Sequence, residues 1–426
     1  FKGVDFCRDE SLVDANRSPY APNLVSDIGG MPEKRLGWRT LLTFEGKING
    51  LFYGEMGGSS VKLVHAGAKL FSFSDTEKTL IHEGISDKRS TGFFMSGKFY
   101  LLTGDNYYCY DGEEFFEVSQ RAYTPTILIS RNPTGGGTVS EAVNLIGKSR
   151  RECFLGTSTD KTYYLSAQNI DELTKVEVMD ANGDMTEYSA TTGEPGTNEF
   201  KADLSAGSIT FAAAHAPVVT GVDNIYITYK KTVEEYEKRI KGCTIFTFYG
   251  VSSENRVFLT GNPDYKAYDF VSGLFDPSYF PDTKYNIVGD TDTAIMGYRK
   301  LGKYLMIVKE PSLQNATVFQ RYGKEDSEGE TWFYHEQGIS GSGAVSKYCF
   351  SDLVDEPLFL SERGVMAISS NSITYERALR NRSYYVNPRL LSEPNLKEAC
   401  ACTWQGYYLL AANGNVYVLD SKNKGY

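Results

Sequence analysis

One short pattern, two apolar runs that meet at a Gly, Asp or Asn turn, occurs six times in this chain and constrains the fold more than any other feature. The clearest copy is Gly97–Gly112, in which two aromatic runs flank the turn Gly104–Asn106. Two strand-forming runs around such a turn are typical of a β-hairpin. The other five copies are Val61–Ser74, Arg256–Phe270, Lys303–Phe319, Pro357–Ser369 and Gly406–Asp420.

The spacing of the six predicted hairpins is nearly regular. Their first strands align on Lys62, Phe99, Val257, Tyr304, Leu358 and Tyr407, which lie 37, 158, 47, 54 and 49 residues apart. The long interval falls to 48 residues when the 110 residues from Thr124 to Val233 are set aside as an insertion. A period of roughly 40–50 residues is that of four-stranded propeller blades. The sequence therefore predicts an all-β fold: a six-bladed β-propeller with an inserted small β-sandwich domain.

We expect four segments along the chain. Residues 1–38 are rich in Pro and Gly and are predicted to form an extended N-terminal arm. Residues 39–123 are predicted to form propeller blades 1–2, residues 124–233 the inserted β-sandwich-like domain, and residues 234–426 blades 3–6. The arm either wraps the outer surface of its own propeller or reaches a neighbouring subunit.

The last predicted blade is one strand short. Its strands are Ala399–Trp404, Tyr407–Ala412 and Val416–Leu419, whereas the apolar run Arg39–Phe44 near the other end of the chain belongs to no blade. Because the edges of short sheets have to be covered, we expect Arg39–Phe44 to pair with the last blade and close the ring. The alternative is a strand in residues beyond Tyr426.

Within the insert, alternating apolar residues at Val176–Val178 and Ile225–Tyr229 predict half-buried strands. Val139–Leu145 is a further predicted strand. Glu234–Lys241 is the best candidate for a short helix, which would lead the chain back to the propeller. The basic cluster Lys148–Arg151 is interpreted as a solvated loop or a subunit contact in preference to a DNA contact.

Composition argues against some functions and indicates the cellular compartment in which the chain folds. With 44 Lys and Arg against 54 Asp and Glu, the net charge of −10 argues against sequence-independent binding of nucleic acid phosphates. Seven widely spread cysteines do not form a disulfide framework and favour folding in a reducing cytoplasm. There is no apolar run long enough for a membrane span and no signal-peptide pattern at the start. The start at Phe1 and the end at Tyr426 lead us to expect a fragment or the ordered part of a longer chain.

No grouping of side chains predicts catalysis, a bound ion or a cofactor, so we expect no catalytic, cofactor-binding or metal-binding residues and no enzyme activity. The four histidines lie one to a segment, without the spacing of metal ligands; they are His65, His82, His215 and His335. Cys400 and Cys402 face the same way in a predicted strand, but no further ligand lies near them in the sequence.

Two glycine-containing loops resemble binding motifs only in part. Asp180–Asp184 with Glu187 has the composition of a calcium loop, but it lacks the twelve-residue pattern and is predicted to be a hairpin turn. Gly135–Gly137 lacks the Lys-Ser or Lys-Thr pair of a phosphate-binding loop and is interpreted as a flexible link.

Two other functions are compatible with a propeller. A glycoside hydrolase would need two facing carboxylates, which could come from Asp111, Glu113, Glu114, Asp290 and Asp292. An adhesin would use the insert to bind a receptor or carbohydrate by aromatic stacking, for which the candidates are Tyr163, Tyr164, Tyr188 and Tyr226. In strands, such tyrosines also pack a core.

Several short motifs, in this order along the chain, resemble the tail hub or nozzle proteins of tailed bacteriophages, a family that includes the packaged-DNA stabilisation proteins. In the second half they are Gly261–Asp264, Pro277–Pro281, Gln337–Gly341, Ala344–Lys347, Phe359–Ser361 with Gly364 and Val365, Arg382–Tyr384 and Pro388–Leu391. At the start they are Ala21–Leu24, Glu33–Arg35 and Gly37. The resemblance covers most of the predicted propeller but not the insert.

The resemblance implies a structural virion component. Such a protein would form a homo-oligomeric ring, hexameric by family likeness, below the portal, and would contact portal or adaptor proteins and tail fibre or needle proteins. Double-stranded DNA would pass through the ring during packaging and ejection without specific binding, which an acidic protein permits. The expected location is the virion tail, after folding and assembly in the cytoplasm of the bacterial host.

Overall fold

The computed structural model describes residues 1–426 except 27–29, 181, 218, 371–376 and 421–426. Nearly all regular structure in the described residues is β-strand, so the predicted all-β class is confirmed. The helices are short: α1 (Tyr236–Lys241), α2 (Asn387–Leu390) and the 3-10 turns η1 (Glu10–Leu12), η2 (Val118–Arg121), η3 (Tyr384–Val386) and η4 (Leu396–Glu398). Helix α1 lies inside the range 234–241 that the sequence predicts to be helical.

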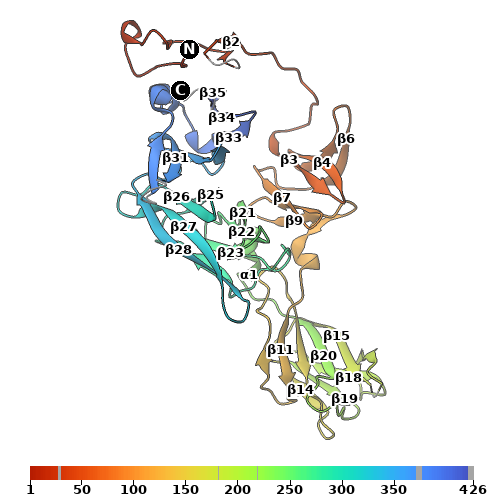
Figure 1. The fold of residues 1–426 in the computed structure, drawn as a ribbon. Coiled ribbons are helices and arrows are strands. Elements are labelled where there is room, and N and C mark those ends of the chain that lie inside the picture. The colour runs from red at the N-terminus through yellow and green to blue at the C-terminus, as the bar shows by residue number, and fades with distance from the viewer. Residues whose placement is uncertain (27–29, 181, 218, 371–376, 421–426) are drawn as a thin grey trace.

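Six antiparallel sheets follow one another along the chain, and in each the strands pair in sequence order (Figure 1). Sheet 1 consists of β3 (Ile48–Met56), β4 (Ser59–Ala66), β5 (Lys69–Phe73) and β6 (Lys78–Glu83). Sheet 2 consists of β7 (Thr91–Met95), β8 (Lys98–Leu102), β9 (Tyr107–Tyr110) and β10 (Phe115–Glu117). Sheet 3 consists of β21 (Ile245–Tyr249), β22 (Arg256–Thr260), β23 (Tyr268–Val271) and β24 (Tyr285–Ile287).

The remaining three sheets follow the same plan. Sheet 4 consists of β25 (Ile295–Leu301), β26 (Tyr304–Lys309), β27 (Ala316–Glu325) and β28 (Thr331–Ser340). Sheet 5 consists of β29 (Ser351–Leu353), β30 (Glu356–Ser361), β31 (Gly364–Ser370) and β32 (Arg377–Asn381). Sheet 6 consists of β33 (Cys400–Trp404), β34 (Tyr407–Ala412) and β35 (Asn415–Asp420), so within the described residues it has three strands.

Each predicted hairpin corresponds to the second and third strands of one sheet. In sheet 2, for example, Phe99 of β8 pairs with Tyr110 of β9 across the turn that the sequence predicts. The second strand of most of the sheets is largely buried, as the run from Phe99 to Leu102 illustrates. Central strands read as continuous apolar runs because both of their faces are covered, and this is why the hairpin pattern is visible in the sequence.

A separate hydrophobic core joins each sheet to the next. Leu63 and Leu101 belong to the core between sheets 1 and 2, and Tyr100 and Val257 to the core between sheets 2 and 3. The cores between the later sheets include Phe258 with Leu305, Val308 with Phe359, and Leu360 with Leu410. The sheets are therefore stacked side by side in chain order, in an arc that Figure 1 shows from one side.

The prediction that Arg39–Phe44 pairs with the last sheet is wrong, because these residues form no strand. The ring of Phe44 lies 5.3 Å from that of Phe71 and 6.2 Å from that of Phe73, both on β5 of sheet 1. The Lys78 ammonium also donates a hydrogen bond of 2.8 Å to the Thr43 carbonyl. Aromatic packing holds this segment against sheet 1 in place of strand pairing with sheet 6.

The N-terminal arm lies on the last part of its own chain. The Phe6 amide donates to the Tyr385 carbonyl at 2.8 Å, and the Arg17 guanidinium carbon lies 3.6 Å from the centre of the Tyr385 ring. Farther along the arm, β1 (Leu24–Val25) pairs with β2 (Glu33–Lys34). The arm thus passes from the neighbourhood of sheets 5 and 6 to the start of sheet 1, as Figure 1 shows.

Two sheets make up the insert and share one core (Figure 1). The six-stranded sheet has the order β12-β11-β13-β20-β15-β16, with β11 and β13 parallel, and the four-stranded sheet has the order β14-β19-β18-β17. Their bounds are β11 (Thr126–Arg131), β12 (Thr138–Val139), β13 (Ser149–Phe154), β14 (Thr162–Tyr164), β15 (Glu172–Met179), β16 (Met185–Glu187), β17 (Ser189–Thr191), β18 (Glu199–Asp203), β19 (Ser208–Phe211) and β20 (Ile225–Lys230).

Two predictions within the insert are wrong. The segment Val139–Leu145 is a strand only at its first residue; Leu145 and Ile146 leave the insert and join the core between sheets 2 and 3. The basic cluster Lys148–Arg151 is no loop, because Ser149 to Arg151 open the central strand β13. Arg150 is buried there, with its guanidinium carbon 5.9 Å from the Tyr229 ring centre.

Candidate functional site

The connections that lead into the first strands of four sheets meet at one point. Arg89 precedes β7, Tyr348 precedes β29 and Glu398 precedes β33. The Arg89 guanidinium carbon lies 3.4 Å from the centre of the Tyr348 ring, and its Nη1 donates to the Glu398 carbonyl at 3.0 Å. This contact joins residues 309 positions apart. It brings the connection between sheets 1 and 2 next to the connection between sheets 5 and 6.

Sheet 3 reaches the same point through Thr244, the residue before β21. The Lys347 ammonium donates to the Thr244 hydroxyl at 3.0 Å, and the Thr91 hydroxyl donates to the Thr244 carbonyl at 2.8 Å. Burial has the largest effect on the pKa of Lys347 and lowers it. The charge of Glu398 acts to raise this pKa and the charge of Arg89 to lower it, and the pKa lies below its usual value. We call Arg89, Thr91, Thr244, Lys347, Tyr348 and Glu398 the axial cluster.

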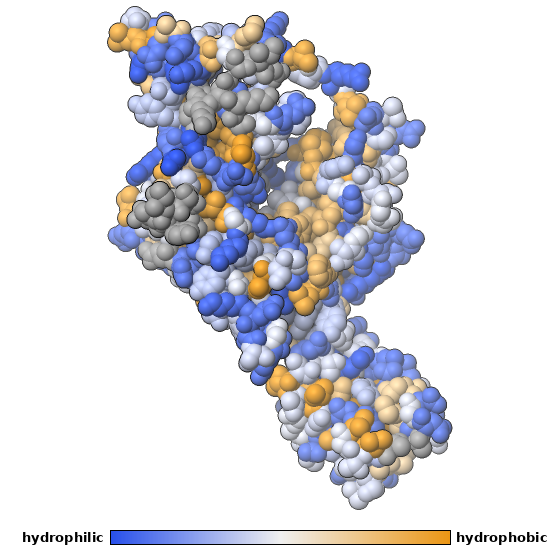
Figure 2. All heavy atoms as spheres, in the orientation of Figure 1, coloured by the Kyte–Doolittle hydropathy of each residue, from blue (hydrophilic) through white to orange (hydrophobic). Residues whose placement is uncertain are grey.

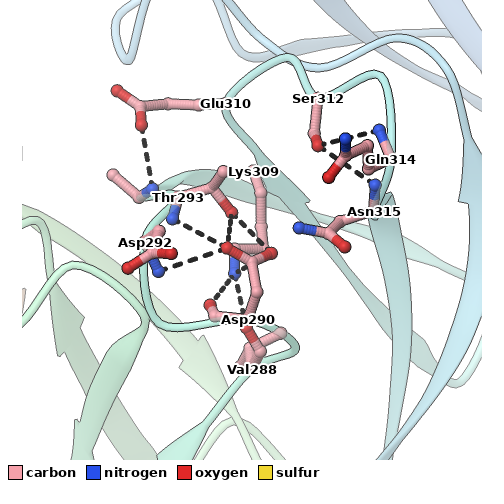
Figure 3. Close-up of polar contacts among 10 residues, drawn as sticks. Val288, Asp290, Asp292, Thr293, Lys309, Glu310, Ser312, Gln314 and Asn315 are labelled. Atoms are coloured by element: carbon pink, nitrogen blue, oxygen red, sulfur yellow. Dashed lines mark hydrogen bonds and ion pairs between the residues drawn. The ribbon is translucent and has the colours of Figure 1, made fainter.

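A second polar cluster surrounds Lys309, whose side chain is fully buried at the end of β26 (Figure 3). The ammonium donates to the carbonyls of Val288 at 2.7 Å and Asp290 at 2.5 Å. It also lies 3.3 Å from the Asp290 carboxylate. The lysine therefore holds the connection between sheets 3 and 4 in one conformation.

The two ionised groups in this cluster respond differently to burial. Desolvation lowers the pKa of Lys309, although Asp290 acts in the opposite direction. Burial acts to raise the pKa of Asp290, but hydrogen bonds from Thr293 and the charge of Lys309 outweigh it and lower this pKa. Thr293 donates to the carboxylate from both its amide and its hydroxyl, each at 2.9 Å. Asp290 is thus fully engaged in fixing a loop.

The candidate carboxylates from the sequence fall into two separate places. Asp111 lies in the turn between β9 and β10, where it accepts from the amides of Glu113 at 3.0 Å and Glu114 at 2.8 Å. Asp290 lies in the connection that enters sheet 4, at the opposite end of the strands, and the amide of Asp292 donates to it at 3.2 Å. The structure therefore does not bring these two groups into one facing pair.

The four histidines lie in four different environments. His65 is completely buried, with Nδ1 2.8 Å from the Ser90 hydroxyl, and burial lowers its pKa. Burial also lowers the pKa of His215, which packs on Phe211, and of His335. His82 stacks on Phe115 at 4.5 Å, as given by the distance between ring centres.

The two glycine-containing loops that the sequence offers for ligand binding form turns. The Asp180 carboxylate accepts from the amides of Asn182 at 2.8 Å and Asp184 at 2.9 Å, as in an ordinary turn. Gly136 lies in the turn after β11, where its carbonyl accepts from Arg131 at 2.8 Å. Among the described residues, no group of three or more His, Cys, Asp or Glu side chains could hold a metal ion, and all seven cysteines are free thiols.

The tyrosines proposed for carbohydrate stacking are mostly engaged within the insert. Tyr163 is completely buried between Phe154 and Phe211. Tyr188 packs edge-on against Phe211, and Tyr226 is half-buried. Tyr164, at 45% exposure, is the one with a large free surface.

A cleft of about 530 Å³ lies where the insert joins sheet 2 and helix α1. It is lined by Glu117, Ser119, Gln120, Ala122, Gly147, Lys148, Ser149, Asp171, Lys230, Thr232, Glu237 and Lys241. Lys241 pairs with Glu117 at 3.1 Å and with Glu237 at 2.9 Å, and Lys148 lies 3.5 Å from Glu237. The positive charges of this cleft are matched by carboxylates, so it has no excess charge to attract an ionic ligand.

Sequence reasoning missed the axial cluster. All of its members except Thr91 lie outside the strands, and Arg89 and Glu398 are too far apart in the chain for any local pattern to connect them. A signal was nevertheless present, because each member lies at the start of the first strand of a sheet or within about four residues before it. Aligning the repeats on their first strands would have placed these residues side by side.

The comparisons with known proteins leave the chain without a family. No family model matches it, and no curated protein matches it. Among the described residues, no helix has the length and apolar character that crossing a membrane requires.

Several solved structures are similar to the chain over most of its length. The extracellular domain of a one-component system from B. thetaiotaomicron is 11% identical, with a TM-score of 0.32, 89% of this chain covered and 39% of that chain. Apo AztD from Citrobacter koseri is 9% identical, with a TM-score of 0.34 and 90% and 86% of the two chains covered. Kuenenia stuttgartiensis hydrazine synthase is 8% identical, with a TM-score of 0.27 and 90% and 99% covered.

Such low TM-scores and identities assign neither a fold family nor an activity to this chain. The chain also spans only 39% of the length of the first two structures that it matches.

Proposed function

We propose that the six sheets are the blades of a six-bladed β-propeller, with the insert as a small β-sandwich, and that the protein is a structural subunit of a bacteriophage tail hub or nozzle. Two observations support the propeller. Five separate cores join consecutive sheets, and the axial cluster joins the inner ends of sheets 2, 3, 5 and 6. Sheets arranged radially around an axis would make both kinds of contact.

The observation that carries the proposed role is the docking of the N-terminal arm on two segments that resemble the phage family. Tyr384, in the motif Arg382–Tyr384, accepts a hydrogen bond from the Cys7 thiol of the arm at 3.0 Å. Arg389, in the motif Pro388–Leu391, has its guanidinium carbon 5.6 Å from the Phe6 ring centre. Motifs from the end of the chain thus form the surface on which the N-terminal arm docks, so they have a common structural task.

The arm also carries apolar side chains that its own chain leaves uncovered. Leu36 is 90% exposed and Trp38 is 82% exposed, and they flank Gly37 in another of the motifs. Large apolar side chains that are freely exposed are typical of protein contact sites. We infer that this part of the arm contacts a neighbouring subunit, or a portal or adaptor protein, in the assembled ring.

The path of DNA follows from the axial cluster. Arg89 stacks on Tyr348 and so links the connections that enter sheets 2 and 5. In the proposed propeller this contact would cross the axis, so double-stranded DNA would pass through a ring of subunits and not through a single propeller. The net charge of −10 suits a channel that does not retain DNA, because each phosphate neutralised by Lys or Arg adds affinity. The insert extends away from the six sheets (Figure 1) and is free to face outward.

Electron microscopy tests this function. We expect the purified chain, alone or with the portal and adaptor proteins encoded beside it, to form rings with a central opening, and gold-labelled antibody to bind virions at the tail vertex. The double variant Leu36→Ser/Trp38→Ser should lose the rings and keep its fold, whereas Leu313→Ser, which changes a 96% exposed leucine off the arm, should keep them. A chain that stays monomeric with its partners and is absent from virions would overturn the proposal.

A further inference from the structure

Sheets 1 and 6 each pack only one of their two faces on a neighbouring sheet. The five cores of the arc lie between sheets 1 and 2, 2 and 3, 3 and 4, 4 and 5, and 5 and 6. Among the described residues no core cluster joins sheet 6 to sheet 1, although these are the two ends of the arc. Sheets 2 to 5 are therefore covered on both sides, and the two terminal sheets are not.

The free face of sheet 6 is apolar. Paired residues of an antiparallel sheet point to the same side, and Leu409 pairs with both Cys402 and Val418. Val418 is 46% exposed, and Cys402 is exposed. Trp404, two residues beyond Cys402, is 58% exposed on the same side. The opposite face of this sheet is buried against sheet 5, where Tyr408 and Leu410 are each 1% exposed.

The corresponding face of sheet 1 is also apolar, and it is partly covered, because Phe44 lies against Phe71 and Val64 is fully buried. Leu51 pairs with Val64, Val64 pairs with Phe71, and Phe71 pairs with Leu80, so these four residues form one row across the sheet. Leu51 is 68% exposed and Leu80 is 45% exposed. Tyr53, two residues along β3, is 70% exposed. The other face of the sheet is buried against sheet 2.

The two free faces belong to sheets that are already connected at two points. At the inner end, Arg89, between sheets 1 and 2, donates to the Glu398 carbonyl just before β33. Along the arm, the Tyr407 hydroxyl of sheet 6 donates to the Ser26 carbonyl at 3.4 Å, while Phe44 packs on sheet 1. Figure 2 shows the molecule hollowed between the sheets at the two ends of the arc, with apolar residues along the hollow.

We propose that the free faces of sheets 1 and 6 pack on each other within one chain, which closes the arc into a ring, and that the arm is the strap across this seam. The seam residues are Leu51, Tyr53 and Leu80 of sheet 1 and Cys402, Trp404 and Val418 of sheet 6. The inference rests on the proposed six-bladed architecture. Each of these two faces is apolar and is one sheet in size. Every other face of the six sheets packs on an adjacent sheet, and these two faces lack such a partner among the described residues.

Closure by the same chain differs from two other ways of covering these faces. A second copy could place its sheet 1 on sheet 6 of the first, which would be a heterologous contact between chains. The apolar arm residues Leu36 and Trp38 could instead lie in the seam. The existing link between Arg89 and Glu398 favours the same chain, because it holds the two sheets at high effective concentration before they pack.

Cysteine chemistry distinguishes these arrangements. In a Cys7→Ser background, Cys402 is the exposed native thiol, and Leu51→Cys adds a second thiol on the opposite face. Packed sheets lie about 10 Å apart, so a bismaleimide of about that length should link the two thiols. We expect a cross-link within one chain, seen as an unchanged mass on a denaturing gel with the linked peptides identified by mass spectrometry, at a yield that does not depend on protein concentration.

The second measurement is the rate at which a maleimide labels Cys402 in protein that carries no substitution in either face. We expect Cys402 to react with a maleimide roughly tenfold or more slowly than Leu274→Cys, a control thiol at a 56% exposed position away from the seam. Cross-links between chains, which increase with concentration, would overturn the closure and leave the proposed ring of subunits standing. Cys402 reacting as fast as the control, with no cross-link, would show an open arc and also overturn it.

Discussion

Asp269 and Arg321 form an ion pair in which neither side chain is exposed: the Asp269 Oδ2 lies 2.6 Å from the Arg321 Nη1. Asp269 belongs to β23 of sheet 3 and Arg321 to β27 of sheet 4, so the pair crosses the boundary between two sheets. The Tyr298 hydroxyl donates to the same carboxylate at 2.9 Å, and Asn286 donates to its other oxygen at 2.8 Å. The carboxylate is therefore well satisfied inside an apolar boundary.

Breaking this pair from one side should be costly. We expect Asp269→Asn or Arg321→Met alone to lower the free energy of unfolding by about 3–5 kcal/mol, because each leaves a buried charge without its partner. The double variant should lose less than the sum of the two single losses. Urea unfolding measures all three. As a control, Lys62→Met removes an exposed pair with Asp75 and should cost less than about 1 kcal/mol.

Stability should decrease at mildly acidic pH because of buried histidines. Burial lowers the pKa of His65, His215 and His335 in the folded chain below the ordinary value of 6.5. A group of this kind stabilises the folded state fully above its unfolded pKa, and this contribution is lost as the pH falls below that value. We expect the thermal midpoint to fall between about pH 7.5 and about pH 5.

The variant His65→Gln should show a smaller fall in thermal midpoint over the same pH range, since it removes one of the three titrating groups. His82→Gln changes a half-buried histidine on an outer strand of the same sheet and serves as the control. A pH profile that His65→Gln leaves unchanged would show that His65 does not contribute to it.

Sheets 1 and 2 approach each other closely at Gly54. A Cβ atom at this position would overlap the ring of Phe94, so the glycine lets the aromatic ring lie against the β3 backbone. We expect Gly54→Ala to destabilise the protein by about 1–3 kcal/mol, as overpacking of a core usually does. Gly37→Ala, where a Cβ meets nothing within 4 Å, should leave the unfolding midpoint unchanged. Equal effects of the two substitutions would contradict the close approach.

Leu145 belongs to the insert in sequence but to the arc in structure. It is 1% exposed in the core between sheets 2 and 3, and its amide donates to the Phe280 carbonyl at 2.8 Å. We expect Leu145→Ala to cost about 2–5 kcal/mol, with faster hydrogen exchange in sheets 2 and 3 and unchanged exchange in the core of the insert. Val139→Ala, at a 76% exposed position of β12, should stay within about 0.5 kcal/mol of the parent.

The sequence predicts the fold well where a strand is buried on both faces. Runs such as Phe99–Leu102 and Val257–Leu259 are continuous and apolar, and each lies in the second strand of its sheet. Prediction fails where a contact with a distant segment decides the structure. Arg39–Phe44 has the pattern of a strand, but the rings of Phe71 and Phe73 hold it against sheet 1.

The same reasoning explains the failures in the insert. Ser149–Arg151 reads as a charged loop, yet Arg150 is covered by Tyr229 in the centre of a sheet, since a long cationic side chain can pack its stem and stack its head. The axial cluster could not be predicted from the sequence, for a simpler reason. The stacking of Arg89 on Tyr348 depends on how four sheets are placed together, which local patterns do not specify.

The docking of the arm has a consequence for how the protein is made. Phe6 and Arg17 are synthesised well before Tyr385 and Arg389, on which they rest. Early sheets can form during translation as domains generally do, whereas the arm has no place to bind until the segment around Tyr385 and Arg389 has emerged. Docking of the arm is thereby tied to synthesis of this later segment, and products truncated before Tyr385 carry an undocked arm that quality-control proteases can recognise.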